Sequence, residues 1–147
     1  MTADVDLTLL TGFGDEAPFV DRLLTSFRGR LDNARDFALE NRTLLLYSSG
    51  GIPLDVSLGA MPFEERTIEQ SSGWVVAEGN VLTTCSAEDL IVHKAFAARD
   101  KDWMDVRGIV ARQGARLRQQ IIWTELLPLL ELAESPDAES KLRAILR

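Results

Sequence analysis

The sequence predicts an α+β fold in which a small mixed β-sheet with flanking helices is followed by a helical C-terminal region. Two observations predict this fold: the first half alternates strand-like and helix-like segments, and the second half has almost continuous helical spacing of apolar residues. The chain has 147 residues, 46% of them hydrophobic, which is enough for a globular core. We expect one domain over residues 1–147, with a sheet part at 1–85 and a helical part at 86–147.

The first elements are a strand, a turn and a helix. Residues 4–10 alternate polar and apolar side chains, and the glycines of residues 11–14 interrupt that alternation. Apolar residues then recur at helical spacing over 19–27, and Gly29 is placed to end the helix. The stretch 37–47 is rich in aliphatic residues and predicts one or two strands.

A turn, a strand and a further hairpin complete the sheet part. Residues 48–51 form a Ser-Ser-Gly-Gly turn before a strand at 52–58, so 37–58 predicts a hairpin. Residues 62–70 predict a short helix. Two short apolar runs at 74–77 and 81–84 predict a second hairpin, and we expect its Trp74 to be a core residue.

The helical part begins at a capping pattern. Ser86 precedes Glu88 and Asp89 as in an N-terminal cap, and apolar residues continue on one face of a helix. Further helices are predicted over 102–113, 119–133 and 137–146, separated by Gly114 and Pro136.

The overall charge and the cysteine content exclude several classes of protein. Sixteen basic and 23 acidic residues give a net charge of −7, which argues against nonspecific DNA binding. The lone Cys85 cannot form an internal disulfide. No apolar run approaches the roughly 20 residues that cross a bilayer, and the first residues lack the pattern of a signal peptide. We expect a cytoplasmic protein without a membrane contact.

Three aspartates are the first candidate site. Asp4 and Asp6 are two apart on the predicted strand, so both carboxylates leave the same face, roughly 7 Å apart. Asp55 lies in an apolar strand, where a charged side chain needs a partner, a metal ion or an exposed face. If the two strands are neighbours, the three carboxylates converge on a site that suits Mg²⁺ and substrate phosphates, as in phosphoryl or nucleotidyl transfer.

Lys94 is the second candidate. It follows Leu90 by four residues and Ile91 by three, so the cation lies on the apolar face of its own helix. Such a lysine would meet an anion such as a phosphate at the border of a cleft. The alternatives for both candidates remain open: Lys94 extends from the edge of the apolar stripe to water, and the aspartates lie on a solvated sheet face.

These residues together resemble the nucleotidyltransferase superfamily. The resemblance rests on the D-x-D pair of Asp4 and Asp6, the strand residue Asp55, the run E-D-L-I-V-H-K that ends at Lys94, and the run R-D-K-D-W-M-D that begins at Arg99. Within the superfamily, the chain is most similar to AbiEii-like and minimal nucleotidyltransferase proteins, many of them from bacterial toxin–antitoxin or phage-defence loci. The likeness covers roughly residues 4–106.

The resemblance implies a role for each matching residue. Asp4 and Asp6 would bind the metal ion, Mg²⁺ or Mn²⁺, and Asp55 would be the third carboxylate, which assists the metal and deprotonates the acceptor hydroxyl. Lys94 would be a catalytic lysine on the phosphate side of the nucleotide. Supporting roles in the neighbouring helical motif fall to Lys101, Asp102 and Asp105.

The implied activity is transfer of a nucleoside monophosphate from an NTP to a hydroxyl of a protein, an RNA or a small molecule. The family also carries a Gly-Gly or Gly-Ser turn before the D-x-D pair, and only Met1, Thr2 and Ala3 precede Asp4 here. We therefore expect either a shortened form of a longer protein or a member that has lost this contact to the nucleotide. Self-association or a protein partner would then cover the sheet surface left open.

Two other classes stay as alternatives. In the first, the chain is a catalytically inactive module of the same fold that binds a partner protein. In the second, it is an unrelated acidic α+β domain whose three aspartates never meet.

Overall fold

The computed structural model describes residues 4–133 and 136–147 and confirms the mixed α+β fold. The chain divides into two compact units, Met1–Arg66 and Thr67–Arg147. The boundary lies within the helix Pro62–Glu69, so the second predicted hairpin belongs to the same unit as the C-terminal helices. Each unit is described by itself below.

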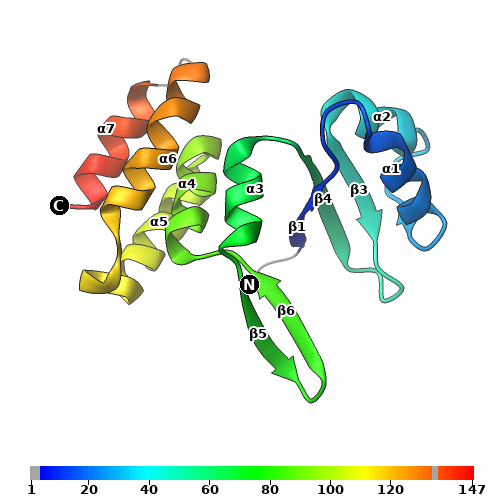
Figure 1. The fold of residues 1–147 in the computed structure, drawn as a ribbon, viewed down its shortest axis with the longest axis horizontal. Helices are drawn as coiled ribbons and strands as arrows, with labels where there is room; N and C mark the ends of the chain where they lie inside the picture. Colours follow the sequence, from blue (N-terminus) through cyan, green and yellow to red (C-terminus); the bar gives the residue numbers. More distant parts are fainter. Residues whose placement is uncertain (1–3, 134–135) are drawn as a thin grey trace. The chain divides into compact units, whose positions relative to one another are not determined.

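The first unit contains a four-stranded sheet, among the residues described, with the strand order β1-β4-β3-β2 (Figure 1). Its strand β1 runs parallel to β4, and the remaining neighbours are antiparallel. The elements in chain order are β1 (Val5–Leu10), α1 (Glu16–Leu24), β2 (Arg28–Gly29), α2 (Ala34–Asn41), β3 (Thr43–Tyr47), β4 (Pro53–Gly59) and the start of α3 (Pro62–Glu69).

Most of the expected elements of this unit are confirmed, and two expectations are wrong. Helix α1 ends at Leu24, and Gly29, which was expected to end it, lies in strand β2. The hairpin of β3 and β4 forms as predicted, but residues 37–41 end helix α2 instead of beginning a strand. Ala34 and Ala38 are four residues apart and both buried, so they present one small-residue face of the helix to the core. Arg42, at φ 53°, then turns the chain out of the helix and into β3.

The core of the first unit lies on one face of the sheet, where α1 and α2 pack (Figure 1). Alternate residues of β3 and β4 supply its aliphatic side chains, as the period of a strand requires. Close packing of α2 on β2 depends on Gly29, because a Cβ there would lie 2.7 Å from Cβ of Ala34. The buried members of this core are Val20, Ala34, Ala38, Leu44, Leu46, Val56 and Leu58.

The second unit combines a two-stranded hairpin with a cluster of helices. Helix α4 contacts α5, α6 and α7, and the predicted helical boundaries hold to within a few residues. Ser86 caps α4 by accepting a hydrogen bond from the Asp89 N–H, as expected. Within 4–133 and 136–147, no helix is long and apolar enough to cross a membrane. The elements are β5 (Ser72–Ala77), β6 (Asn80–Thr84), α4 (Ala87–Ala97), α5 (Asp100–Gln113), the 3-10 turn η1 (Gly114–Arg116), α6 (Gln119–Leu132) and α7 (Pro136–Ile145).

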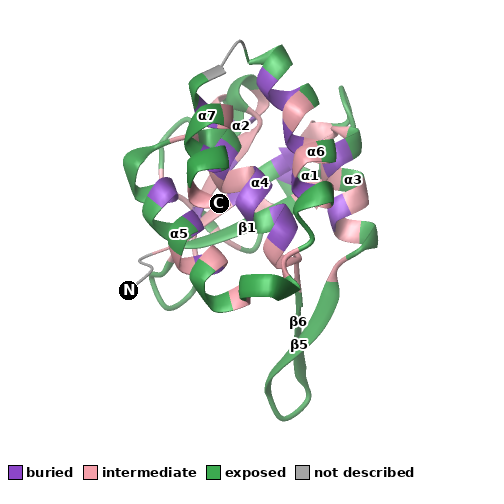
Figure 2. Cartoon of the chain, turned by 90° about the vertical axis from the view of Figure 1, so that its left-hand side faces the viewer, coloured by how far each residue is buried: buried purple, intermediate pink, exposed green. Residues whose placement is uncertain are grey.

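The hairpin of β5 and β6 is exposed along almost its whole length (Figure 2). Trp74 pairs with Leu82 and Val75 pairs with Val81, so apolar side chains leave both faces of the hairpin. The expectation of a core tryptophan is wrong for Trp74, a residue that is 63% exposed. A two-stranded ribbon has too few neighbours to bury both of its faces.

We expect Leu44→Ala to lower the free energy of unfolding by about 2–5 kcal/mol, because it removes a fully buried side chain from the core of the first unit. Leu45→Ala is the matched control, since Leu45 is the next residue on β3 and is only half-buried on the other face of the sheet. Urea unfolding of both variants measures the difference. Equal losses would contradict a core confined to one face.

Candidate functional site

The face of the first sheet opposite its core is lined by polar and charged side chains. Because side chains alternate along a strand, the burial of Val56 and Leu58 on one face directs Asp55 and Ser57 of β4 to the other. On the neighbouring strand β1, Thr8 lies opposite Ser57 and is exposed. We call this surface, with Asp6, Thr8, Arg28, Arg30, Leu45, Tyr47, Asp55 and Ser57, the open face.

Asp6 and Asp55 lie directly opposite each other on the open face. They are register partners in the parallel pair of β1 and β4, and neighbouring strands are about 4.8 Å apart. Asp6 is exposed, and its carboxylate has no ion pair within the described part of the chain. The register makes Asp6 and Asp55 neighbours on adjacent strands, and the alternative in which the three aspartates do not converge stays open.

Asp4 lies directly before β1, and within the described residues it does not form a three-carboxylate cluster with Asp6 and Asp55. Among residues 4–133 and 136–147, no group of three or more His, Cys, Asp or Glu side chains is arranged to hold a metal ion. The donor chemistry nevertheless fits a divalent cation, because Mg²⁺ is commonly held by one or two carboxylates together with substrate phosphates. Asp6 and Asp55 supply that number of hard oxygen ligands on adjacent strands.

Arg30 is a residue of the open face that the sequence analysis missed. Its N–H donates to the Leu45 carbonyl, 2.9 Å away, which continues the pairing of β2 with β3 for one residue beyond the strand. The Arg30 side chain reaches past Leu45 of β3 to strand β4, where its Nη2 donates a hydrogen bond to Oδ1 of Asp55. Arg30, Leu45, Asp55 and Asp6 thus form one row across the four strands. In the sequence, the only indication of a basic sheet edge is that Arg28 and Arg30 are two residues apart and so share one face of a strand.

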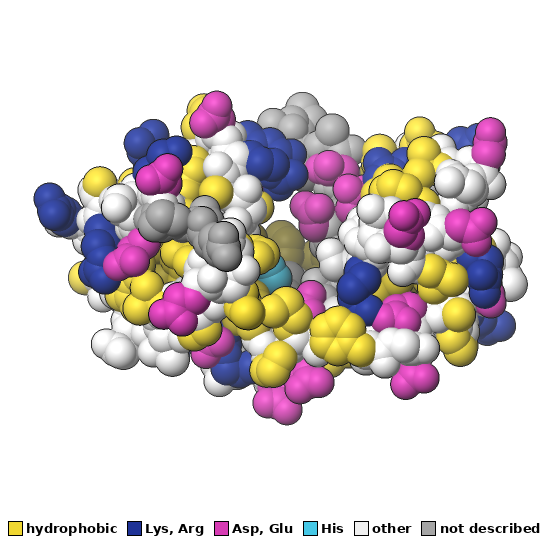
Figure 3. Space-filling model, turned by 90° about the horizontal axis from the view of Figure 1, so that it is seen from above, with side chains coloured by type: hydrophobic (Ala, Val, Ile, Leu, Met, Phe, Trp, Pro, Cys, Tyr) yellow, Lys and Arg dark blue, Asp and Glu magenta, His cyan; other side chains and the backbone are white. Residues whose placement is uncertain are grey.

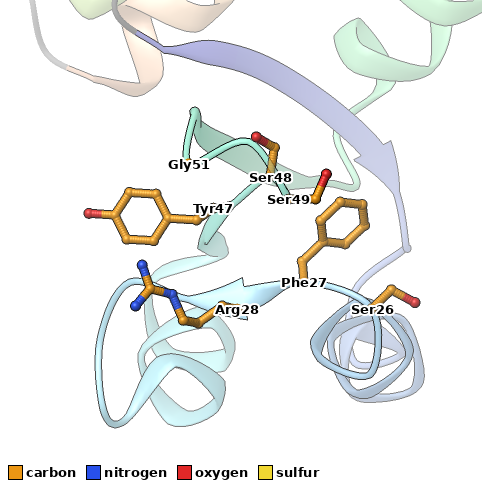
Figure 4. A pocket seen from close by; sticks show the side chains of 7 residues that line it. All are labelled: Ser26, Phe27, Arg28, Tyr47, Ser48, Ser49 and Gly51. Carbon is orange, nitrogen blue, oxygen red and sulfur yellow. The ribbon is translucent and has the colours of Figure 1, made fainter.

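A shallow pocket of about 420 Å³ lies at the end of the sheet where the turn between β3 and β4 meets β2 (Figure 4). The Arg28 guanidinium lies over the Tyr47 ring, 4.8 Å from its centroid, and this contact holds the cation beside the pocket. Ser48 closes the turn, because its Oγ accepts from the Ile52 N–H at 3.0 Å. The lining residues are Ser26, Phe27, Arg28, Tyr47, Ser48, Ser49 and Gly51.

Lys94 belongs to the second unit, where it links α4 to α5. Its Nζ lies 2.8 Å from a carboxylate oxygen of Asp105 and 3.4 Å from Oδ1 of Asp102. The hydrogen bond to Asp105 is the main cause of a raised pKa of Lys94. The two carboxylates account for a lysine on this apolar helix face, and its role toward a phosphate stays a prediction.

Asp102 is fully buried at the start of α5 and is held by several donors. The Arg99 side chain donates through Nε at 2.6 Å and through Nη2 at 3.1 Å, and the Arg99 N–H donates at 3.2 Å. These bonds to Arg99, together with Lys94, hold the pKa of Asp102 below its usual range despite burial. The arrangement satisfies a buried charge, so we interpret it as structural.

The surface charges are mixed in sign. On the face shown in Figure 3, Lys and Arg side chains are interspersed with Asp and Glu side chains.

A comparison of the chain with protein-family models and with curated proteins finds no match.

We expect Asp102→Asn to lower the free energy of unfolding at neutral pH by about 1.5–3 kcal/mol, because it removes charge-assisted hydrogen bonds inside the second unit. A carboxyl with a depressed pKa in the folded state stabilises the fold above the pKa of the unfolded chain, and this contribution is lost as the pH falls through the folded pKa. The difference between the two proteins should therefore shrink below about pH 4.

Urea unfolding at a series of pH values measures this dependence. Asp100→Asn is the matched control, since Asp100 lies in the same helical turn but is exposed. A pH-independent difference for Asp102→Asn would argue against the buried charge as its cause.

Proposed function

We propose that the chain is a nucleotidyltransferase domain that depends on Mg²⁺ or Mn²⁺ and transfers a nucleoside monophosphate from an NTP to a hydroxyl. The observation that carries the proposal is the register of Asp6 opposite Asp55 on the open face. The acceptor is a protein, an RNA or a small molecule, and the setting is a bacterial toxin–antitoxin or phage-defence system, as the sequence resemblance implies.

Asp6 and Asp55 are the residues that would hold the cation, and Asp4, directly before β1, is the third candidate ligand. When bound, such an ion neutralises phosphate charge and favours the ionised form of an attacking hydroxyl. Asp55 accepts the proton of that hydroxyl, whose oxygen forms a bond to the α-phosphorus. The bond from the α-phosphorus to the bridging oxygen breaks, and pyrophosphate leaves with the electron pair.

Neutral side chains of the open face add donors for the substrate. Thr8 and Ser57 are register partners and exposed, so their hydroxyls lie on the same face as the carboxylates. Hydroxyl groups of this kind donate hydrogen bonds to phosphate oxygens without adding charge. The proposal does not require Lys94, since Asp102 and Asp105 already hold its ammonium.

We expect Asp6→Asn and Asp55→Asn each to weaken binding of Mn·ATP by at least about tenfold, because each removes one charged ligand of the cation. Calorimetric titration of the wild type and both variants measures this effect. Asp36→Asn is the control, since Asp36 is an exposed aspartate of α2 in the same unit. Saturable binding that survives in both variants would contradict the proposed site.

A second candidate function is a module that binds a partner protein and has no activity. The exposed apolar hairpin of β5 and β6 favours it, because a monomer would leave Trp74 and its neighbours in water. This candidate gains support if the wild type binds no nucleotide and forms a stable complex with the product of a neighbouring gene.

Under this second candidate, Trp74→Ser should weaken that complex, because Trp74 is the largest exposed apolar side chain of the hairpin. Size-exclusion chromatography of the co-expressed proteins measures the loss. Leu132→Ser is the control, since Leu132 is also exposed but lies on α6. Equal effects of the two substitutions would exclude the hairpin as the binding surface.

A further inference from the structure

The open face has an acidic edge and a basic edge. Asp6 and Asp55 lie on β1 and β4, whereas Arg28 and Arg30 lie on and directly after β2 at the opposite edge of the sheet. The strand between them, β3, contributes the uncharged side chain of Leu45 to the row. A ligand that complements this surface therefore carries a cation at one end and an anion at the other.

The Arg30 side chain has a hydrogen-bond donor that is not used within the described residues. This side chain is only 21% exposed, and within the described residues its ion pair is the single contact of Nη2 with Asp55. Its Nε is buried and has no hydrogen-bond partner among the described residues. A buried N–H without an acceptor is uncommon in folded proteins and calls for an explanation such as an absent ligand. A guanidinium in this position suits a phosphate, which accepts two parallel hydrogen bonds.

Arg30 and a metal cation would compete for the same carboxylate. The guanidinium neutralises Asp55, which reduces the attraction of the acidic edge for a second positive charge. A cation that arrives with phosphates attached brings a new anionic partner for the guanidinium. After this exchange Asp55 faces the cation and Arg30 faces a phosphate oxygen.

We propose that Arg30 is a phosphate-binding residue that pairs with Asp55 until a metal-bound triphosphate replaces it there. This inference rests on the proposed function and adds to it a residue that contacts the triphosphate. Arg30 exchanges one anionic partner for another, from the Asp55 carboxylate to a phosphate oxygen, and no covalent bond changes. The side chain thus disfavours the bare cation and favours the cation that carries phosphates.

The test compares two ligands in one variant. Arg30→Gln should bind free Mn²⁺ several-fold more tightly than the wild type, because Asp55 loses its competing cation. The same variant should bind Mn·ATP about tenfold more weakly, because a charge-assisted hydrogen bond to phosphate is lost. Electron paramagnetic resonance of free Mn²⁺ measures the first affinity, and calorimetry measures the second.

Two further variants sharpen the comparison. Arg30→Lys keeps the positive charge and should restore part of the Mn·ATP affinity. Arg35→Gln is the matched control, since Arg35 also pairs with an aspartate of the first unit, Asp21, but between α1 and α2. It should change neither affinity. Thermal unfolding establishes that each variant is folded.

The outcomes separate this inference from the proposed function. Affinities for Mn²⁺ and Mn·ATP that fall together in Arg30→Gln, or that both stay unchanged, overturn the role of Arg30 while the metal site stands. No Mn²⁺ binding in the wild type, in Arg30→Gln or in Arg35→Gln overturns the metal site and this inference with it. If Arg30→Gln strengthens Mn²⁺ binding and weakens Mn·ATP binding, and both changes disappear when Asp6→Asn is added, the result supports both the metal site and the role of Arg30.

Discussion

The parallel pairing of β1 with β4 is the constraint on which the candidate site depends. A shift of this pairing by one residue would turn Asp6 toward the core and bring Leu7 onto the open face. Leu9 of β1 opposes such a shift, because it packs against the buried core and would turn onto the open face. The apolar pattern that builds the core therefore also determines that two carboxylates, distant in the sequence, lie side by side.

Two buried or half-buried aspartates of this chain differ in how their charge is balanced. Asp102 receives hydrogen bonds from Arg99 and lies beside Lys94, so its environment is complete without a ligand. Asp55, 32% exposed, has one guanidinium and lies next to Asp6, whose carboxylate has no ion pair with any residue that the structure describes. A satisfied ion network stabilises or specifies a fold, whereas neighbouring carboxylates with a partial counter-charge are the arrangement in which cation binding lowers the energy.

The sequence predicts the elements better than it predicts their surroundings. Alternation at 4–10 and 52–58 and helical spacing after Ser86 are local patterns, and the structure confirms them. Helix α2 was missed because the aliphatic run up to Tyr47 hides the left-handed turn at Arg42. Arg30 was missed because its contact with Asp55 crosses β3, and Trp74 was misjudged because exposure depends on which neighbours a hairpin finds. Strand order and long-range side-chain contacts are properties of the assembled sheet, and no local period encodes them.

The separation of charge on the open face has a consequence for selectivity under the proposed function. A free phosphate would approach Arg28 and Arg30 but would be repelled by Asp6, for which the described part of the chain supplies no counter-ion. A bare cation would approach Asp6 but would find Asp55 already neutralised by Arg30. A ligand in which the cation and the phosphates are joined meets both edges at once, with the uncharged Leu45 between them. The same two charged edges that weaken binding of each ion alone therefore favour their complex.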